Sequence, residues 1–182
     1  MRVIPTPIAG CLLLEPRVFR DERGELFEPW NADAWAALGL GVVFVQALQS
    51  RSVAGVVRGL HYQWPRPQAK LIWAIDGEIL DVAVDLRRGS PTFGQHTTAR
   101  LRAGDARQIL IPEGCAHGYG VRSQGAVVGY LLSAPYDPAC DRAVAWDDPA
   151  LGIDWGAEAP ILSPRDRAAP LLSAIDPAHL PR

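Results

Sequence analysis

The chain has 182 residues, 48% hydrophobic and 21% charged, and these values predict one soluble domain with a single sizeable core. Its 18 basic and 20 acidic side chains nearly cancel, so nothing in the charge indicates nucleic acid or an anionic membrane as a partner. No apolar run approaches the ~20 residues of a membrane span, and the first residues lack the apolar stretch of a signal peptide. We therefore expect a cytoplasmic protein. Cys11, Cys115 and Cys140 show no Cys-x-x-Cys spacing, which predicts three free thiols and no structural zinc.

Short strands and one helix are predicted in the first fifty residues. Apolar residues over 10–14 begin two short strand pieces, and the polar, glycine-containing run 21–24 predicts a turn. Asn31 has the residue type of a helix cap, and it precedes a helix expected over 32–38. After the glycines that end this helix, we expect a strand over 42–46, followed by a polar connection.

The stretch from Arg58 to Lys70 collects functional groups that no buried core needs, including an imidazole, a phenol, an indole and an ammonium. Lys70 is the only lysine among the 18 basic residues. Arginine is always charged, whereas lysine is a compact point charge whose pKa shifts readily on desolvation. A compact cation suits a developing oxyanion, and His61 lies only nine residues upstream. We therefore favour a functional site over a surface lysine.

Strand patterns dominate the chain from residue 71 to residue 132. The dipeptide Asp76-Gly77 predicts a tight hairpin between strands at 71–75 and 78–86. Further strands are expected at 97–101, 108–111, 117–121 and 126–132, with turn residues between them. This spacing predicts a mainly β, antiparallel jelly-roll barrel with a binding cavity inside, and an immunoglobulin-like sandwich is the alternative. The proline-rich segment over 137–182 is expected to wrap around the barrel.

Two of the four histidines, His61 and His117, lie within strand-like segments. If both point into the barrel with Lys70 and Tyr130, they form an acid–base site, because neutral imidazole is the natural general base near pH 7. A carboxylate bonded to the far ring nitrogen would fix the tautomer, and Asp166 is the candidate, although a solvated turn aspartate is the plainer interpretation.

Metal binding is not predicted, because the chain has no His-x-His pair and no glutamate at ligand spacing. It also has no glycine-rich phosphate loop of the nucleotide-binding kinds. We expect chemistry without a metal or another cofactor.

Lys70 and four long motifs, at 55–63, 81–94, 111–118 and 146–155, resemble the dTDP-4-dehydrorhamnose 3,5-epimerase family, and the resemblance extends over nearly the whole chain. The resemblance implies a cupin-like jelly roll and a homodimer that exchanges its N-terminal strands, about residues 1–50. It also implies cofactor-independent epimerisation, at C3, C5 or both, of a nucleotide-linked 4-keto-6-deoxyhexose.

The resemblance also assigns roles to individual residues. His61 matches the base that removes the proton beside the ketone, with Asp166 as its orienting partner, Lys70 as the group that stabilises the enolate and Tyr130 as the acid on the opposite face. The implied substrate contacts are Arg58 and His117 to the diphosphate and sugar, Tyr136 to the nucleotide base, Tyr119 near the sugar, and Arg23, Glu28 and Gln46 to the nucleotide.

Three positions depart from the usual family pattern. Leu26 and Leu48 replace a stacking aromatic residue and a phosphate-binding amide, and Tyr119 stands where phenylalanine is common. These departures keep three alternatives open: another nucleotide sugar as substrate, inversion at one carbon only, or a catalytically impaired protein that binds sugar nucleotides.

Overall fold

The structure is a computed structural model that describes residues 1–157 and 159–182, and strands dominate it. In chain order the strands are β1 (Arg2–Pro5), β2 (Leu12–Glu15), β3 (Val18–Asp21), β4 (Gly24–Phe27), β5 (Gln46–Val53), β6 (Val57–Gln63), β7 (Lys70–Asp76), β8 (Glu78–Asp85), β9 (His96–Arg102), β10 (Gln108–Ile111), β11 (Cys115–Val121), β12 (Gly125–Leu132) and β13 (Asp141–Ala143). The helices are α1 (Ala32–Ala37) and α2 (Pro164–Arg167), with 3-10 turns at Leu172–Ala174 and Pro177–His179.

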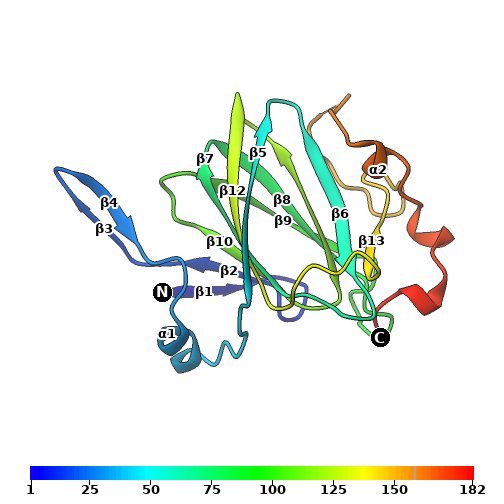
Figure 1. Cartoon of the computed structure of the whole chain (residues 1–182), viewed down its shortest axis with the longest axis horizontal. Helices are drawn as coiled ribbons and strands as arrows, with labels where there is room; N and C mark the ends of the chain where they lie inside the picture. Colours follow the sequence, from blue (N-terminus) through cyan, green and yellow to red (C-terminus); the bar gives the residue numbers. More distant parts are fainter. Residues whose placement is uncertain (158) are drawn as a thin grey trace.

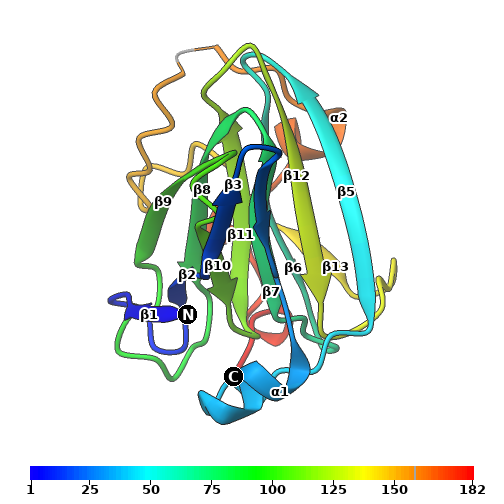
Figure 2. The ribbon, with the colours of Figure 1, turned by 90° about the vertical axis from the view of Figure 1, so that its left-hand side faces the viewer.

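Two sheets face each other and form the body of the protein (Figure 2). One sheet has six strands in the order β1-β2-β10-β7-β12-β5, and the other has five in the order β13-β6-β11-β8-β9. In the part of the chain that the structure describes, all pairings between these strands are antiparallel. The predicted mainly β, antiparallel jelly-roll architecture is confirmed.

The hairpin predicted at Asp76-Gly77 is wrong. β7 pairs with β10 and β12, whereas β8 pairs with β9 and β11, so the chain crosses from one sheet to the other at this point. Gly77 has a φ of 73°, and a Cβ there would lie 2.1 Å from the carbonyl oxygen of Gly125. The turn residues correctly indicate a sharp reversal, but they carry no information about which strands pair across it.

The strand predicted over 42–46 is also misplaced, because β5 begins only at Gln46. Phe44 instead packs edge-to-face on Trp30 and Trp35, with ring centroids 5.8 and 5.5 Å apart, beside α1. The helix itself is confirmed, and the Asn31 side chain caps it by accepting the amide hydrogen of Ala34. β5 was predicted as a polar connection because it is an edge strand that is mostly exposed, which removes the apolar pattern of a buried strand.

The hydrophobic core has a central layer between the sheets and an outer layer on each side. The central layer joins residues of both sheets, such as Ile72 with Leu101. Helix α1 covers the outer face of the six-stranded sheet through Trp35. The C-terminal segment covers the outer face of the five-stranded sheet through residues such as Trp155 and Leu180, and Figure 1 shows it running down beside β6 and β13.

The hairpin of β3 and β4 projects from the body of the protein (Figure 1). It carries two exposed apolar side chains, Phe19 at 51% and Leu26 at 71% exposure. The three cysteines are free, as predicted, and all three are buried. Among the described residues, none of the helices is both long and apolar enough to cross a membrane.

Candidate active site

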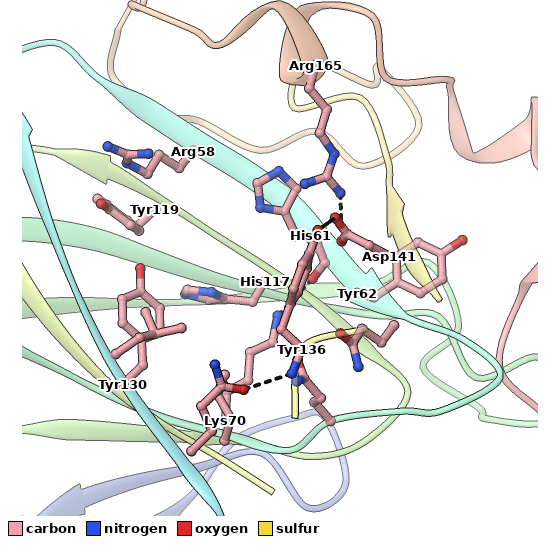
Figure 3. A pocket seen from close by; sticks show the side chains of 15 residues that line it. Arg58, His61, Tyr62, Lys70, His117, Tyr119, Tyr130, Tyr136, Asp141 and Arg165 are labelled. Atoms are coloured by element: carbon pink, nitrogen blue, oxygen red, sulfur yellow. Dashed lines mark hydrogen bonds and ion pairs between the residues drawn. The ribbon is translucent and has the colours of Figure 1, made fainter. Parts of the chain in front are cut away.

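A cavity of about 430 Å³ opens between the two sheets, and eight of the residues predicted from the sequence line it (Figure 3). Its full lining consists of Gln46, Leu48, Arg58, His61, Tyr62, Gln63, Gln68, Lys70, His117, Tyr119, Tyr130, Leu132, Tyr136, Asp141 and Arg165. Residues far apart in the sequence therefore meet in one polar chamber at one end of an otherwise apolar barrel.

His61 lies on β6 and is bonded to a carboxylate from the C-terminal segment. Its Nε2 atom is 2.5 Å from Oδ1 of Asp166, whose side chain is almost fully buried. Burial raises the pKa of Asp166, but the hydrogen bonds from His61 and Ser163 outweigh this effect and leave the pKa below its ordinary value. Asp166 is therefore ionised at neutral pH and fixes which imidazole nitrogen carries the proton.

Local structure explains how Asp166 reaches His61 across more than a hundred residues of sequence. The Ser163 side chain caps α2 by accepting the amide hydrogen of Asp166 at 3.0 Å. Just before α2, the backbone of Ile161 bonds to the chain at the start of β6. Further along β6, Leu60 and Val144 exchange two backbone hydrogen bonds. These contacts fix the C-terminal segment against the strand that carries His61.

Lys70 opens β7 on the opposite sheet, and its side chain is only 8% exposed. Its Nζ atom donates a hydrogen bond to the carbonyl oxygen of His61 at 3.1 Å, which ties the two sheets together at the cavity. Burial lowers the pKa of Lys70 from 10.5 to about 8, with Asp141 and Asp81 acting in the opposite direction. The side chain is an ammonium at neutral pH, and it is poorly solvated, so it attracts negative charge in the cavity strongly.

Tyr130 lies on β12 in the same sheet as Lys70, and His61 lies in the facing sheet. Figure 3 shows the phenol and the imidazole on different sides of the cavity. Burial raises the pKa of Tyr130 well above its ordinary value, so the phenol keeps its proton. The imidazole and the protonated phenol thus reach the cavity from opposite sides.

His117 is the cross-strand neighbour of His61 and has a carboxylate partner of its own. Its Nε2 atom is 2.8 Å from Oδ2 of Asp81, and both side chains are buried. Burial lowers the pKa of His117, partly offset by Asp81, so the imidazole is neutral. Asp81 was not among the site residues predicted from the sequence, although an aspartate within a strand of apolar residues was a usable signal.

A second group of side chains surrounds the cavity mouth. Asp141 accepts a hydrogen bond from the hydroxyl of Tyr136 at 3.0 Å and pairs with Arg165 at 2.7 Å (Figure 3). Gln46 accepts the amide hydrogen of Tyr136 at 2.8 Å. No periodic signal marked Asp141, which comes from a three-residue edge strand, and Arg165 was not selected although it directly precedes the predicted Asp166.

Comparisons with known proteins identify the family. A model of the dTDP-4-dehydrorhamnose 3,5-epimerase family matches residues 5–174. The chain is 47% identical over 178 residues to dTDP-4-dehydrorhamnose 3,5-epimerase of Pseudomonas aeruginosa, covering 97% of this chain and 98% of that one. This protein belongs to the dTDP-4-dehydrorhamnose 3,5-epimerase family.

A solved structure and a relative that is a 3-epimerase extend the comparison. The dTDP-6-deoxy-D-glucose-3,5-epimerase of Legionella pneumophila, solved in complex with dTDP-4-keto-L-rhamnose, is 44% identical, has a TM-score of 0.96 and covers 100% of this chain and 97% of that one. A dTDP-4-dehydrorhamnose 3-epimerase of Streptomyces niveus is 41% identical over 182 residues, covering 99% of this chain and 88% of that one. The fold is the cupin-like jelly roll of this epimerase family.

Two predicted contacts of the epimerase lie outside the cavity of a single chain. Arg23 sits at the tip of the projecting hairpin, where it pairs with Asp21, and Glu28 accepts a hydrogen bond from Asn31. Neither residue lines the cavity, whereas Leu48, one of the departures from the family pattern, does. The structure therefore separates the predicted nucleotide contacts into a set that lines the cavity and two residues, Arg23 and Glu28, on or next to the hairpin.

The side chains of the described residues form no cluster of three or more histidine, cysteine, aspartate or glutamate groups that could hold a metal ion. Chemistry without a metal remains a prediction, and a chelation experiment tests it directly.

Proposed function

We propose that this protein epimerises a dTDP-linked 4-keto-6-deoxyhexose at C3 and C5, with His61 as the base and Tyr130 as the acid. One observation carries the proposal: these two groups reach into one cavity from facing sheets, with a buried ammonium beside them. Inversion of a carbon requires that the proton leaves from one face of the sugar ring and returns to the other. The positions of His61 and Tyr130 in facing sheets support such a route.

In the first step, His61 removes the proton from the carbon beside the ketone, and the electron pair moves to the ketone oxygen as an enolate. Asp166 holds the imidazole in the tautomer that presents a free nitrogen and stabilises the imidazolium that forms. Lys70 meets the negative charge on the enolate oxygen. A donor in such a position is worth about 3–4 kcal/mol of transition-state stabilisation.

In the second step, Tyr130 gives its proton to the same carbon from the opposite face, and the enolate returns to the ketone. His117 is neutral and buried beside these groups, so it is suited to hydrogen-bonding a sugar hydroxyl rather than to taking the proton. The same set of groups can act on the carbons on both sides of the ketone, because both carbons are α to that ketone and either enolate carries its negative charge on the same oxygen.

The nucleotide is placed at the cavity mouth, where Tyr136 is 54% exposed and offers a ring for stacking on the base. Arg58 and Arg165 line the cavity and supply positive charge for the diphosphate.

A second copy of the chain completes this site in our proposal. An isolated two-stranded hairpin is marginally stable in water, so the hairpin with Phe19 and Leu26 needs a surface to pack on. A homodimer that exchanges residues from the first fifty supplies that surface. It also brings Arg23 and Glu28 of the partner subunit to the nucleotide, and the assembly is expected in the cytoplasm.

The proposal is tested by incubating the protein with dTDP-4-keto-6-deoxyglucose and following the sugar protons by NMR. Inverted product from the dTDP sugar is expected, with no turnover of the GDP, CDP or UDP analogues. Turnover of another nucleotide sugar alone would move the substrate assignment to that nucleotide. Tight binding of dTDP without any turnover would show a binding protein and contradict the proposed activity.

A further inference from the structure

The segment that carries Tyr136 crosses from one sheet to the other at the cavity mouth. It joins β12 of the six-stranded sheet to β13 of the five-stranded sheet over residues 133–140. These residues lie outside the strands, so strand pairing does not hold them, and Pro135 has no amide hydrogen to donate. Their backbone polar groups therefore need partners from side chains or water.

Glutamines that line the cavity supply these partners. Gln68 donates a hydrogen bond to the carbonyl oxygen of Ala134 at 2.6 Å. Gln63 accepts the amide hydrogen of Asp137 at 2.8 Å and donates to the carbonyl oxygen of Pro135 at 3.4 Å. A side-chain amide can accept and donate at once, so Gln63 offers the segment what a neighbouring strand would offer.

Gln46 adds a third amide by accepting the amide hydrogen of Tyr136 itself at 2.8 Å. The four consecutive residues 134–137 therefore each meet a glutamine side chain. Gln46 lies on β5 of the six-stranded sheet and Gln63 lies on β6 of the five-stranded sheet. The segment is thus fastened to both walls of the cavity.

The amide groups of Gln63 and Gln68 are used by the backbone around them. Gln63 is only 4% exposed and Gln68 only 7%, and the second amide hydrogen of Gln63 is donated to the carbonyl oxygen of Arg66 at 3.1 Å. The far end of the Tyr136 ring is also held, because its hydroxyl donates to Asp141 (Figure 3). The ring is therefore fixed both through its backbone and through its hydroxyl group.

We infer that Gln63 and Gln68 are positioning residues for nucleotide binding, because they hold the backbone of residues 134–137 and so fix the ring of Tyr136 before the nucleotide arrives. This inference rests on the proposed stacking of Tyr136 on the nucleotide base. A ring that is already held in its binding conformation loses less conformational freedom when the base stacks on it, so affinity rises. The effect falls on binding rather than on the proton transfers.

The test compares the Kd for dTDP, measured by calorimetry, with KM and kcat for dTDP-4-keto-6-deoxyglucose in Gln68→Met. Methionine is unbranched, like glutamine, and suits a buried position, but it cannot donate to the carbonyl oxygen of Ala134. Kd and KM are expected to rise about fivefold, the effect of one lost hydrogen bond. At saturating substrate, kcat should change by less than about twofold, because the lost interaction contributes equally to the ground state and the transition state.

Tyr136→Ala decides whether Gln68 acts through the ring. Removing the ring should raise the Kd for dTDP by about 10–100-fold. In this background Gln68→Met should add little, because groups that act as one unit are not additive. Gln63→Met should behave in the same way, and it carries the test if Gln68→Met does not fold. The matched control is Ser123→Ala, which removes a side chain that accepts the amide hydrogen of Glu78 in a turn outside the cavity lining, and it should leave Kd, KM and kcat unchanged.

An equal rise in Kd with and without the Tyr136 ring would overturn the inference, because Gln68 would then act on the nucleotide directly. A fall in kcat with an unchanged KM, or a native Kd in both glutamine variants, would overturn it as well. Failure of the proposed function is a different result: the native protein would bind dTDP but would not turn over dTDP-4-keto-6-deoxyglucose, while the comparison of Kd values needs binding alone. A native protein that binds no dTDP would overturn both.

Discussion

Replacing Lys70 by methionine is expected to stabilise the fold while it removes activity. Burial lowers the pKa of Lys70 from 10.5 to about 8. One pKa unit is equivalent to ~1.4 kcal/mol, so keeping the ammonium in the cavity costs the folded state about 3 kcal/mol at pH 7. The substitution also removes the hydrogen bond to the carbonyl oxygen of His61, worth ~1 kcal/mol, and the expected net gain is about 2 kcal/mol.

The pH dependence gives the sign of this effect. The lowered pKa means that between about pH 8 and pH 10.5 the unfolded chain binds the lysine proton more tightly than the folded chain does. Native stability therefore rises with pH across this window, while the methionine variant lacks this contribution. The advantage of Lys70→Met should be fully present at pH 7 and disappear near pH 10.5.

Urea denaturation of the native protein and of Lys70→Met at several pH values measures the difference in their free energies of unfolding. A turnover assay at pH 7 measures the loss of activity. We expect kcat to fall by about 10²–10³ because the enolate loses its cation. In the native protein, activity should decline as pH rises through about 8 and the ammonium loses its proton. A variant that is destabilised by the same amount at every pH, or that turns over at nearly the native rate, would refute the reasoning.

Other predictions concern the partners of the base, an acid-sensitive loop, the second subunit and metal. Asp166→Asn should lower kcat by about 10²–10⁴ with little change in KM, because the imidazole of His61 loses the partner that fixes its tautomer; a native kcat would contradict this. Burial raises the pKa of Asp85, but hydrogen bonds from Arg87 and neighbouring hydroxyl groups hold it well below its ordinary value. Asp85→Asn should therefore lower the free energy of unfolding by about 3 kcal/mol at pH 7. Acid denaturation curves should show this difference beginning to shrink only below about pH 4, the ordinary pKa of an aspartate. Mixing and refolding inactive Arg23→Ala and His61→Ala chains should restore about a quarter of native activity if each site uses both subunits, and no recovery would contradict the exchange. Dialysis against EDTA should leave turnover unchanged, whereas loss that zinc restores would contradict metal-free chemistry.

Local chemistry made much of the fold predictable. The cap at Asn31 located α1, and alternating apolar residues located β8 to β12 within a few positions. The partners of each strand were not predictable in this way. Asp76-Gly77 looks like a hairpin in sequence, but the strands on its two sides pair in different sheets, because pairing depends on contacts far away in the chain.

The site residues also divide into those that local sequence identifies and those that only the fold brings together. His61 and Lys70 were identifiable because their residue types are unusual in their setting, and the structure places both in one cavity. Asp141 was not identifiable, because only the packing of β13 beside β6 brings it to the cavity, where it pairs with Arg165. The hydroxyl of Tyr119 hydrogen-bonds to Ser50 and Ser52 because β5 approaches β11 at this point. No local sequence pattern reveals this approach.

The most direct test of the account follows deuterium in D₂O with dTDP-4-keto-6-deoxyglucose as substrate, for the native protein, His61→Ala and Tyr130→Phe. The native protein should place deuterium at C3 and C5 as it inverts them, and label at C3 alone would identify a 3-epimerase. His61→Ala should stop exchange at both carbons, while Tyr130→Phe should retain exchange and lose inversion, because the base can return a proton to the face it left. Exchange in His61→Ala at the native rate would contradict the central claim that His61 removes the proton.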